Sequence, residues 1–184
     1  LGAAQEKWLD ENLMRKDARW NCIAQQIMMM PLNRRTYDDQ PEVMYNLDSW
    51  AGYNTPRERL MKRLAKVDNA VVLTGDEHQN YAGLLMSDET PVGVEFGGCS
   101  VTSPGFEGYL PQIPTAMMEQ GLVAANPQLQ WADTSRRGYM AVELTPSAAT
   151  CEWRFVSGIR QRGTTLAGTH RMASALGSNR LGAA

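Results

Sequence analysis

The stretch Ala70-Val71-Val72-Leu73-Thr74-Gly75-Asp76-Glu77-His78 decides how the rest of this chain is interpreted. It begins with a short apolar run rich in β-branched residues, and a glycine then leads directly to a carboxylate and an imidazole. Such a run is typical of a buried strand in an α/β sheet. Ligands and catalytic groups gather where loops leave the carboxyl ends of these strands. The stretch therefore predicts a strand that places polar side chains at one edge of a sheet.

Asp76 and His78 are separated by one residue, so in an extended loop their side chains project to the same side. Zinc, iron and manganese accept a carboxylate oxygen together with a neutral imidazole nitrogen. This spacing predicts a metal site. The same spacing also fits an aspartate that caps the next helix, with a histidine that packs beside it. The spacing alone does not decide between the two.

The composition describes a globular protein of ordinary size. The 184 residues are 43% hydrophobic and 21% charged, which suffices for one domain with a substantial core. The net charge is −2, so nothing predicts a surface that binds nucleic acid. No apolar stretch approaches the roughly 20 residues that cross a bilayer, and we expect no membrane partner. His78 and His170 are the only histidines, which limits any metal site.

Periodicity and turn residues predict a mixed order of helices and strands. Apolar residues at helical spacing predict helices over residues 5–16, 56–66 and 116–121. Apolar or alternating runs predict strands over residues 20–30, 70–74, 81–86 and 92–96, and then an antiparallel hairpin of residues 138–144 and 151–156. We expect the helices 5–16 and 56–66 to lie on one face of a mixed sheet, and the hairpin near 138–156 to belong to that sheet.

Two segments lack this regularity. Residues 31–53 are polar and poor in periodicity, and loops of this length in a compact domain tend to be functional. Residues 158–184 are rich in Gly, Ala, Ser and Thr, so we separate a domain of residues 1–157 from a polar tail of residues 158–184. We expect little of the tail in the core, with at most a short helix over 169–176. Replacing His170 in this tail is therefore expected to change almost nothing.

Five segments of the chain match one known family in their order and spacing. The longer ones are Leu1–Leu9 followed by Arg19–Gln26, Asp48–Tyr53 leading into Pro56–Leu60, and Val72–His78. The shorter ones are Glu95–Gly98 with Thr102–Gly105, and Ala132–Asp133 with Arg137–Tyr139. Together they resemble the PhoD-like alkaline phosphatase/phosphodiesterase family of metallophosphatases. The resemblance covers roughly residues 1 to 156.

The resemblance implies an α/β fold in which this chain forms half of a four-layer α/β/β/α metallophosphoesterase sandwich. In the family, most ligands of the metal centre precede the part that this chain matches, and the Gly-Asp-x-His motif comes last. The first residues form no signal peptide, no initiator methionine is present, and a helix is expected from Gln5. We therefore expect the chain to begin inside a longer protein, whose missing N-terminal half is its partner and without which the enzyme is incomplete.

The resemblance implies that Asp76 and His78 are ligands of divalent or trivalent metal ions, with iron and calcium as the metals. Metal ions neutralise the phosphate oxygens, lower the pKa of bound water and align it with the leaving group. Hydrolysis of phosphodiesters or phosphomonoesters is the implied reaction. Beyond the two ligands, the sequence assigns no catalytic residue.

Four further residues are candidates for contact with the phosphate-ester substrate. Asn21 and Gln25 belong to a strand that is expected beside that of Asp76, so they contact substrate, support the metal ligands, or simply form strand-edge hydrogen bonds. Arg34 and Arg35 lie on the loop 31–53, where they bind phosphate as bidentate donors or remain solvated at the surface. The sequence leaves these alternatives open.

Three expectations concern the surroundings of the site. Trp50 and Tyr53 are expected to anchor the loop 31–53 to the core. The family tends to have Asp in Trp-Asp-Gly-Tyr, whereas this chain has Ala51, which bears on the shape of the pocket. A periplasmic or extracellular location is implied by the resemblance alone. A function of a different class also fits the sequence: a non-catalytic α/β interaction module, in which Asp76 is a helix cap and His78 a core residue.

Overall fold

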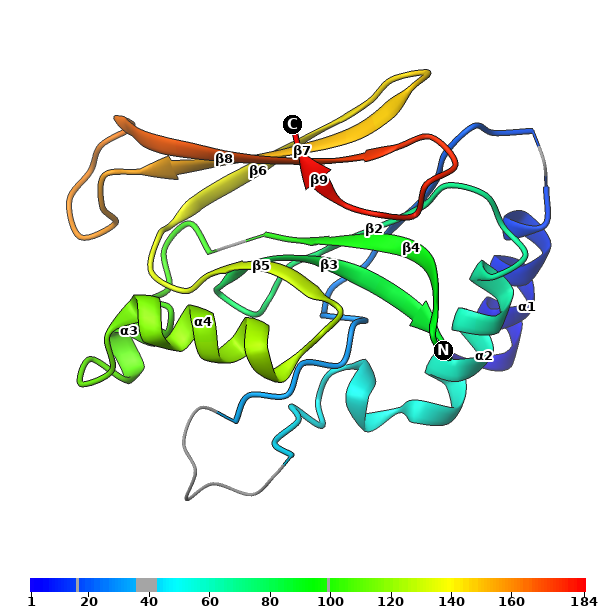
Figure 1. Cartoon of the computed structure of the whole chain (residues 1–184), viewed down its shortest axis with the longest axis horizontal. Helices are drawn as coiled ribbons and strands as arrows, with labels where there is room; N and C mark the ends of the chain where they lie inside the picture. Colours follow the sequence, from blue (N-terminus) through cyan, green and yellow to red (C-terminus); the bar gives the residue numbers. More distant parts are fainter. Residues whose placement is uncertain (16, 36–42, 99) are drawn as a thin grey trace.

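The computed structural model describes residues 1–15, 17–35, 43–98 and 100–184, and Figure 1 shows the arrangement of its elements. The helical elements are α1 (Ala3–Leu13), the short 3-10 turn η1 (Trp50–Gly52), α2 (Asn54–Leu64), α3 (Phe106–Tyr109) and α4 (Thr115–Ala125). The strands are β1 (Asn21–Ala24), β2 (Ala70–Thr74), β3 (Asn80–Ser87), β4 (Thr90–Gly97), β5 (Leu129–Asp133), β6 (Gly138–Leu144), β7 (Ala148–Val156), β8 (Leu166–Ala175) and β9 (Gly182–Ala183).

The first sheet is mixed and has the strand order β1-β2-β4-β3-β5. Strand β2 pairs in parallel with both β1 and β4, whereas β3 runs antiparallel to β4 and β5. Four of its strands, β1, β2, β4 and β5, therefore run in one direction. Their carboxyl ends lie at the same edge of the sheet, toward the left in Figure 1.

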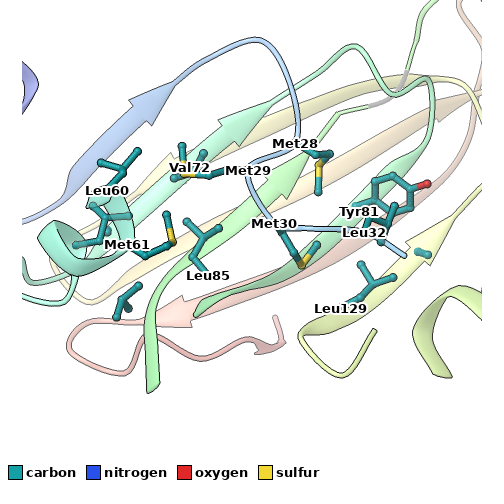
Figure 2. Close-up of a cluster of buried hydrophobic side chains, with 14 of the residues drawn as sticks. Met28, Met29, Met30, Leu32, Leu60, Met61, Val72, Tyr81, Leu85 and Leu129 are labelled. Carbon is teal, nitrogen blue, oxygen red and sulfur yellow. The ribbon is translucent and has the colours of Figure 1, made fainter. Parts of the chain in front are cut away.

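Both faces of this first sheet are covered. Val72, Tyr81 and Leu85 face a core shared with α1, α2 and α4, which includes Leu60 and Met61 of α2 (Figure 2). The opposite face contributes to a second core, which lies between the two sheets. A strand covered on both faces reads as an uninterrupted apolar run, which is why residues 70–74 predicted β2 correctly.

The second sheet is antiparallel, with the order β6-β7-β8-β9. Alternate residues of β7 point inward and are fully buried, namely Ala149, Cys151, Trp153 and Phe155. This alternation is the pattern of an antiparallel sheet with one covered face. The described residues thus form three layers: helices, the first sheet and the second sheet (Figure 1).

The structure confirms the mixed α/β class and corrects several boundaries. Helices α1 and α2 start two residues before the predicted 5–16 and 56–66. A proline is tolerated throughout the first helical turn, where N–H groups have no intrahelical acceptor, so Pro56 does not fix the start of α2. The strand expected over 20–30 is limited to β1. Met28, Met29 and Met30 are all buried, whereas the alternation of an edge strand would expose every second one.

Two predictions about the last third of the chain are wrong. The hairpin of β6 and β7 belongs to the second sheet, not to the sheet that α1 and α2 cover. The segment 169–176 is not helical, because β8 pairs with β7 along nine residue pairs. Met172 and Ser174 of β8 are buried, and the ring of His170 stacks on Trp131. Apart from Met172 and Ser174, no residue of 158–184 is buried, as expected, although β8 and β9 join the second sheet.

Within the described parts of the chain, none of the helices combines the length and the apolar character needed to cross a bilayer.

Candidate metal centre

The carboxyl edge of the first sheet gathers segments that are distant in sequence. The loop 75–79 follows β2, residues 98 and 100–105 follow β4, and the turn 134–137 follows β5. Backbone hydrogen bonds connect these segments to each other and to the residues after β1. Gly75 N donates to Gln26 O (3.1 Å), Gly98 N to Thr74 O (2.8 Å), and Gly138 N to Ser100 O (3.2 Å). This edge is where a parallel arrangement of strands places ligand-binding groups.

Asp76 and His78 lie on the loop that follows β2, and both have left-handed backbone conformations. Their φ angles are 69° and 60°, a region that costs a non-glycine residue roughly 1–2 kcal/mol. The loop is therefore not extended, so the condition under which both side chains would project to the same side is not met. Strained residues of this kind cluster at functional sites. Two of them in three positions support a functional role for this loop.

The side chains of Asp76 and His78 make no hydrogen bond or ion pair to the described residues. Asp76 is exposed and His78 is partly exposed. No helix follows Asp76, because the next element is β3, so the alternative in which it caps a helix is wrong. A carboxylate and an imidazole without protein partners are free to coordinate a metal. The structure finds no group of three or more His, Cys, Asp or Glu side chains suited to a metal within the described residues.

Glu77, between these two residues, has a structural partner. Its side chain is only 5% exposed and forms an ion pair with Arg34. This pair joins the first part of the loop 31–53, at Arg34, to the loop 75–79. No role for Glu77 can be read from the sequence, because a contact across 43 positions leaves no local pattern.

Arg137, on the turn after β5, supports the His78 backbone. Its guanidinium donates to the carbonyl oxygen of His78, to the Glu107 carboxylate (2.9 Å) and to the carbonyl oxygen of Thr134 (3.0 Å). A Cβ at Gly105 would lie 2.0 Å from its Nη2 atom, so only glycine permits this close approach. Arg137 lies in one of the shorter segments that resemble the family, but the sequence alone does not show what its side chain does.

Glu95, on β4, is a fully buried carboxylate close to the carboxyl end of that strand. Its two oxygens accept hydrogen bonds from the backbone N–H groups of Met29 (2.8 Å) and Met30 (2.7 Å). Arg57 donates to the carbonyl oxygen of Met29 from the same side (2.8 Å). Burial raises the pKa of Glu95 to about 7, although its hydrogen bonds to Met29, Met30 and Thr74 and the nearby Arg57 oppose that rise. Glu95 therefore fixes the course of the chain after β1.

The raised pKa of Glu95 predicts a pH-dependent stability. The folded state binds this proton more tightly than the unfolded state, so stability is lost as pH rises from about 4.5 through about 7. Between these limits we expect the free energy of unfolding of wild type to fall by about 2–3 kcal/mol relative to that of Glu95→Gln, whose amide does not titrate. Urea unfolding at pH 4.5 and 7.5 measures this difference. The matched change at an exposed carboxylate, Glu143→Gln, should show none, and a constant difference at Glu95 would contradict the prediction.

The four substrate-contact candidates separate into two groups. Asn21 begins β1 and pairs with Ala70 at the start of β2, so it lies at the opposite end of the sheet from Asp76. Its amide donates to the carbonyl oxygen of Asp68 (2.9 Å), and its predicted role at the site is therefore wrong. Arg34 and Arg35 lie on the loop that the Arg34–Glu77 pair holds beside Asp76, and substrate contact by them stays a prediction.

Gln25 has local partners that account for its position. Its Oε1 atom accepts hydrogen bonds from the Trp50 indole (3.1 Å) and from the backbone of Ile27 (3.2 Å), and its amide nitrogen donates to the Ile27 carbonyl. Local hydrogen bonding, one of the three alternatives, is what the structure shows. The same contact confirms that Trp50 anchors its loop, whereas Tyr53 is exposed. Residues 36–42 of that loop lie outside the described part of the chain.

Comparison with known proteins finds relatives that are similar to this chain in sequence and in structure. The family model described as PhoD-like phosphatase matches residues 1–153. "Alkaline phosphatase D" of Bacillus subtilis (strain 168) is 32% identical over 173 residues, which are 90% of this chain and 28% of that protein. A solved structure described as "Structure of PhoD" matches with a TM-score of 0.83 and 28% identity, over 100% of this chain and 35% of that one. The chain thus spans about a third of the length of these relatives.

Proposed function

The chain belongs to the PhoD-like phosphatase family, and from this premise we propose that it is the carboxyl-terminal part of a metal-dependent phosphoesterase. Its reaction is the hydrolysis of phosphodiesters or phosphomonoesters. The observation that carries the proposal is the pair Asp76 and His78, whose side chains have no partner among the described residues, on a strained loop at the carboxyl edge of the first sheet. The resemblance noted from the sequence is supported along nearly the whole chain.

We propose that Asp76 and His78 contribute two ligands of the metal centre. The donor set fits iron, which accepts imidazole nitrogen and carboxylate oxygen, and the carboxylate also suits calcium. When bound, such ions would neutralise the phosphate oxygens and activate water for attack on phosphorus. His78 coordinates a metal through a ring nitrogen that carries no proton.

The chain's own residues hold this pair of ligands in place. Arg137 supports the backbone of His78, and the Arg34–Glu77 pair fixes the residue between the two ligands. Arg34 and Arg35 are the cations we propose to orient the anionic substrate from the loop 31–53. Two ligands are too few for a centre of several metal ions, so the remaining ligands come from a partner segment, the N-terminal half of the same protein.

The same partner segment would complete the architecture. We propose a four-layer α/β/β/α sandwich, to which the described residues contribute three layers. The fourth would cover the outer face of the second sheet. A periplasmic or extracellular location is proposed from membership of the family alone.

The purified 184-residue chain should therefore hydrolyse phosphate esters poorly. We expect turnover of a chromogenic phosphodiester, with iron and calcium added, to be no faster than that of the same chain carrying His78→Ala, because most ligands are absent. The assay compares the two chains at equal concentration and pH. Robust turnover by wild type alone would mean that the described residues hold a complete site, and the proposed division of the centre would be wrong.

A further inference from the structure

An open cavity of about 690 Å³ lies between the turn that follows β5 and the segment that joins β7 to β8. Small-molecule sites typically measure roughly 300–1,000 Å³. The turn and the β7–β8 segment both lie at the same side of the molecule as the carboxyl ends of β2 and β5 (Figure 1). The cavity therefore borders the edge that carries Asp76 and His78, without including either residue.

The charged residues that line this cavity are mostly cations. They are Arg136, Arg137, Arg160 and Arg162, with Glu107 as the only carboxylate among the lining residues. This concentration of positive charge is unexpected in a chain whose net charge is −2. It favours an anionic ligand.

Two of these arginines form the fixed wall of the cavity. Arg137 is engaged with Glu107 and with the carbonyl oxygen of His78. Arg136 pairs with Asp133, and its guanidinium carbon lies 3.9 Å from the centre of the Phe155 ring. Arg137 both lines the cavity and donates to the backbone of His78. The cavity and the candidate metal centre are therefore separated by no more than one arginine side chain.

Arg160 and Arg162 form the opposite wall and are unpaired. Both are exposed on the segment between β7 and β8, and neither makes a hydrogen bond or ion pair with the residues that the structure describes. Guanidinium groups bind phosphate with two parallel N–H···O bonds. Two arginines without partners among the described residues, in one cavity lining with Arg136 and Arg137, are suited to a phosphate group.

We propose that this cavity is a second phosphate subsite, which binds a phosphate group of the substrate beyond the ester that is cleaved. This inference rests on the proposed function and narrows the substrate class to chains that carry two or more linked phosphate groups. The metal centre acts on one phosphate, while the arginine cavity selects and orients the chain through the next.

Titration calorimetry on the metal-free chain tests the subsite without any turnover. The probe is inorganic tripolyphosphate at low salt, with orthophosphate as the single-phosphate comparison. Arg160→Gln/Arg162→Gln should weaken tripolyphosphate binding at least 10-fold. The matched double variant Arg171→Gln/Arg180→Gln removes two exposed arginines elsewhere and should bind as wild type does, as should His78→Ala. Circular dichroism melts confirm that each variant is folded.

Three results would overturn the subsite: unchanged affinity in Arg160→Gln/Arg162→Gln, an equal loss in Arg171→Gln/Arg180→Gln, or orthophosphate binding as tightly as tripolyphosphate. Loss of binding in His78→Ala would place the anion at the metal centre and overturn it too. A different result would overturn the proposed function, namely that His78 binds no metal. In that case tripolyphosphate binding that depends on Arg160 and Arg162 would still support an anion site.

Discussion

Replacing His78 by alanine should lower phosphoesterase activity by about 100-fold or more in a polypeptide that carries the complete site, because it removes a proposed metal ligand. The same change should leave the fold almost as stable as wild type. The His78 imidazole is partly exposed and makes no hydrogen bond to the described residues, so little packing is lost. Initial rates with a chromogenic phosphodiester, together with thermal unfolding, measure both effects.

His170→Ala is the matched control, and its expected effects are the reverse. The His170 ring stacks on Trp131 with a centroid distance of 4.0 Å. Its loss should lower the free energy of unfolding by about 1–2 kcal/mol with little change in activity per folded molecule. The sequence, which placed His170 in a tail, predicted almost no effect. If both variants lost a similar, small amount of activity, His78 would be an ordinary structural residue and an interaction module would be the better account.

Replacing Trp153 by alanine has the largest expected effect on stability, a loss of about 3–5 kcal/mol. Trp153 is fully buried between the two sheets, where its ring contacts Phe96 and Trp131 at centroid distances of 5.8 and 4.7 Å. Its indole donates to the carbonyl oxygen of Gly97 (2.9 Å). Gly97 is the last residue of β4, so the loss also loosens the segment that leads into the site.

Urea unfolding of two further variants tests whether the loss of stability is specific to the buried indole of Trp153. Trp153→Phe keeps most of the ring volume but leaves the Gly97 carbonyl without its donor, so we expect an intermediate loss of about 1–3 kcal/mol. Trp8→Ala removes an exposed tryptophan of α1 and should change stability by less than about 0.5 kcal/mol. A loss below about 1 kcal/mol for Trp153→Ala would show that the two sheets do not depend on this contact.

The sequence predicted those elements whose pattern is local. The run 70–74 and the alternation of β7 each identify a strand without reference to any other part of the chain. Strand β8 escaped prediction because its sequence, Leu166–Ala175, consists largely of small and polar residues. It is held by pairing with β7 and by the contact between His170 and Trp131. The sheet to which the β6–β7 hairpin belongs depends on such distant pairings too.

The candidate site divides in the same way. Asp76 and His78 were found because a strand, a glycine and two polar residues follow one another in sequence. The residues that support them were not found, since Arg137 and His78 are 59 positions apart and Glu95 and Met29 are 66 apart. Asn21 was misplaced because neighbouring parallel strands bring together residues at equal distances from their ends. Asn21 therefore lies beside Ala70, at the start of β2.

The most direct test of the proposed metal site follows the two histidine side chains by NMR while a metal is added. His78 and His170 are the only histidines, so each imidazole gives its own ¹⁵N signals, which His78→Ala assigns. Zn²⁺ serves as a diamagnetic substitute for iron because it accepts the same donors, and the titration is carried out at pH 7.5. We predict saturable shifts for His78 but not for His170, and their loss in Asp76→Ala. Equal shifts at both histidines, or a His78 response that survives Asp76→Ala, would contradict the assignment of Asp76 and His78 as joint ligands.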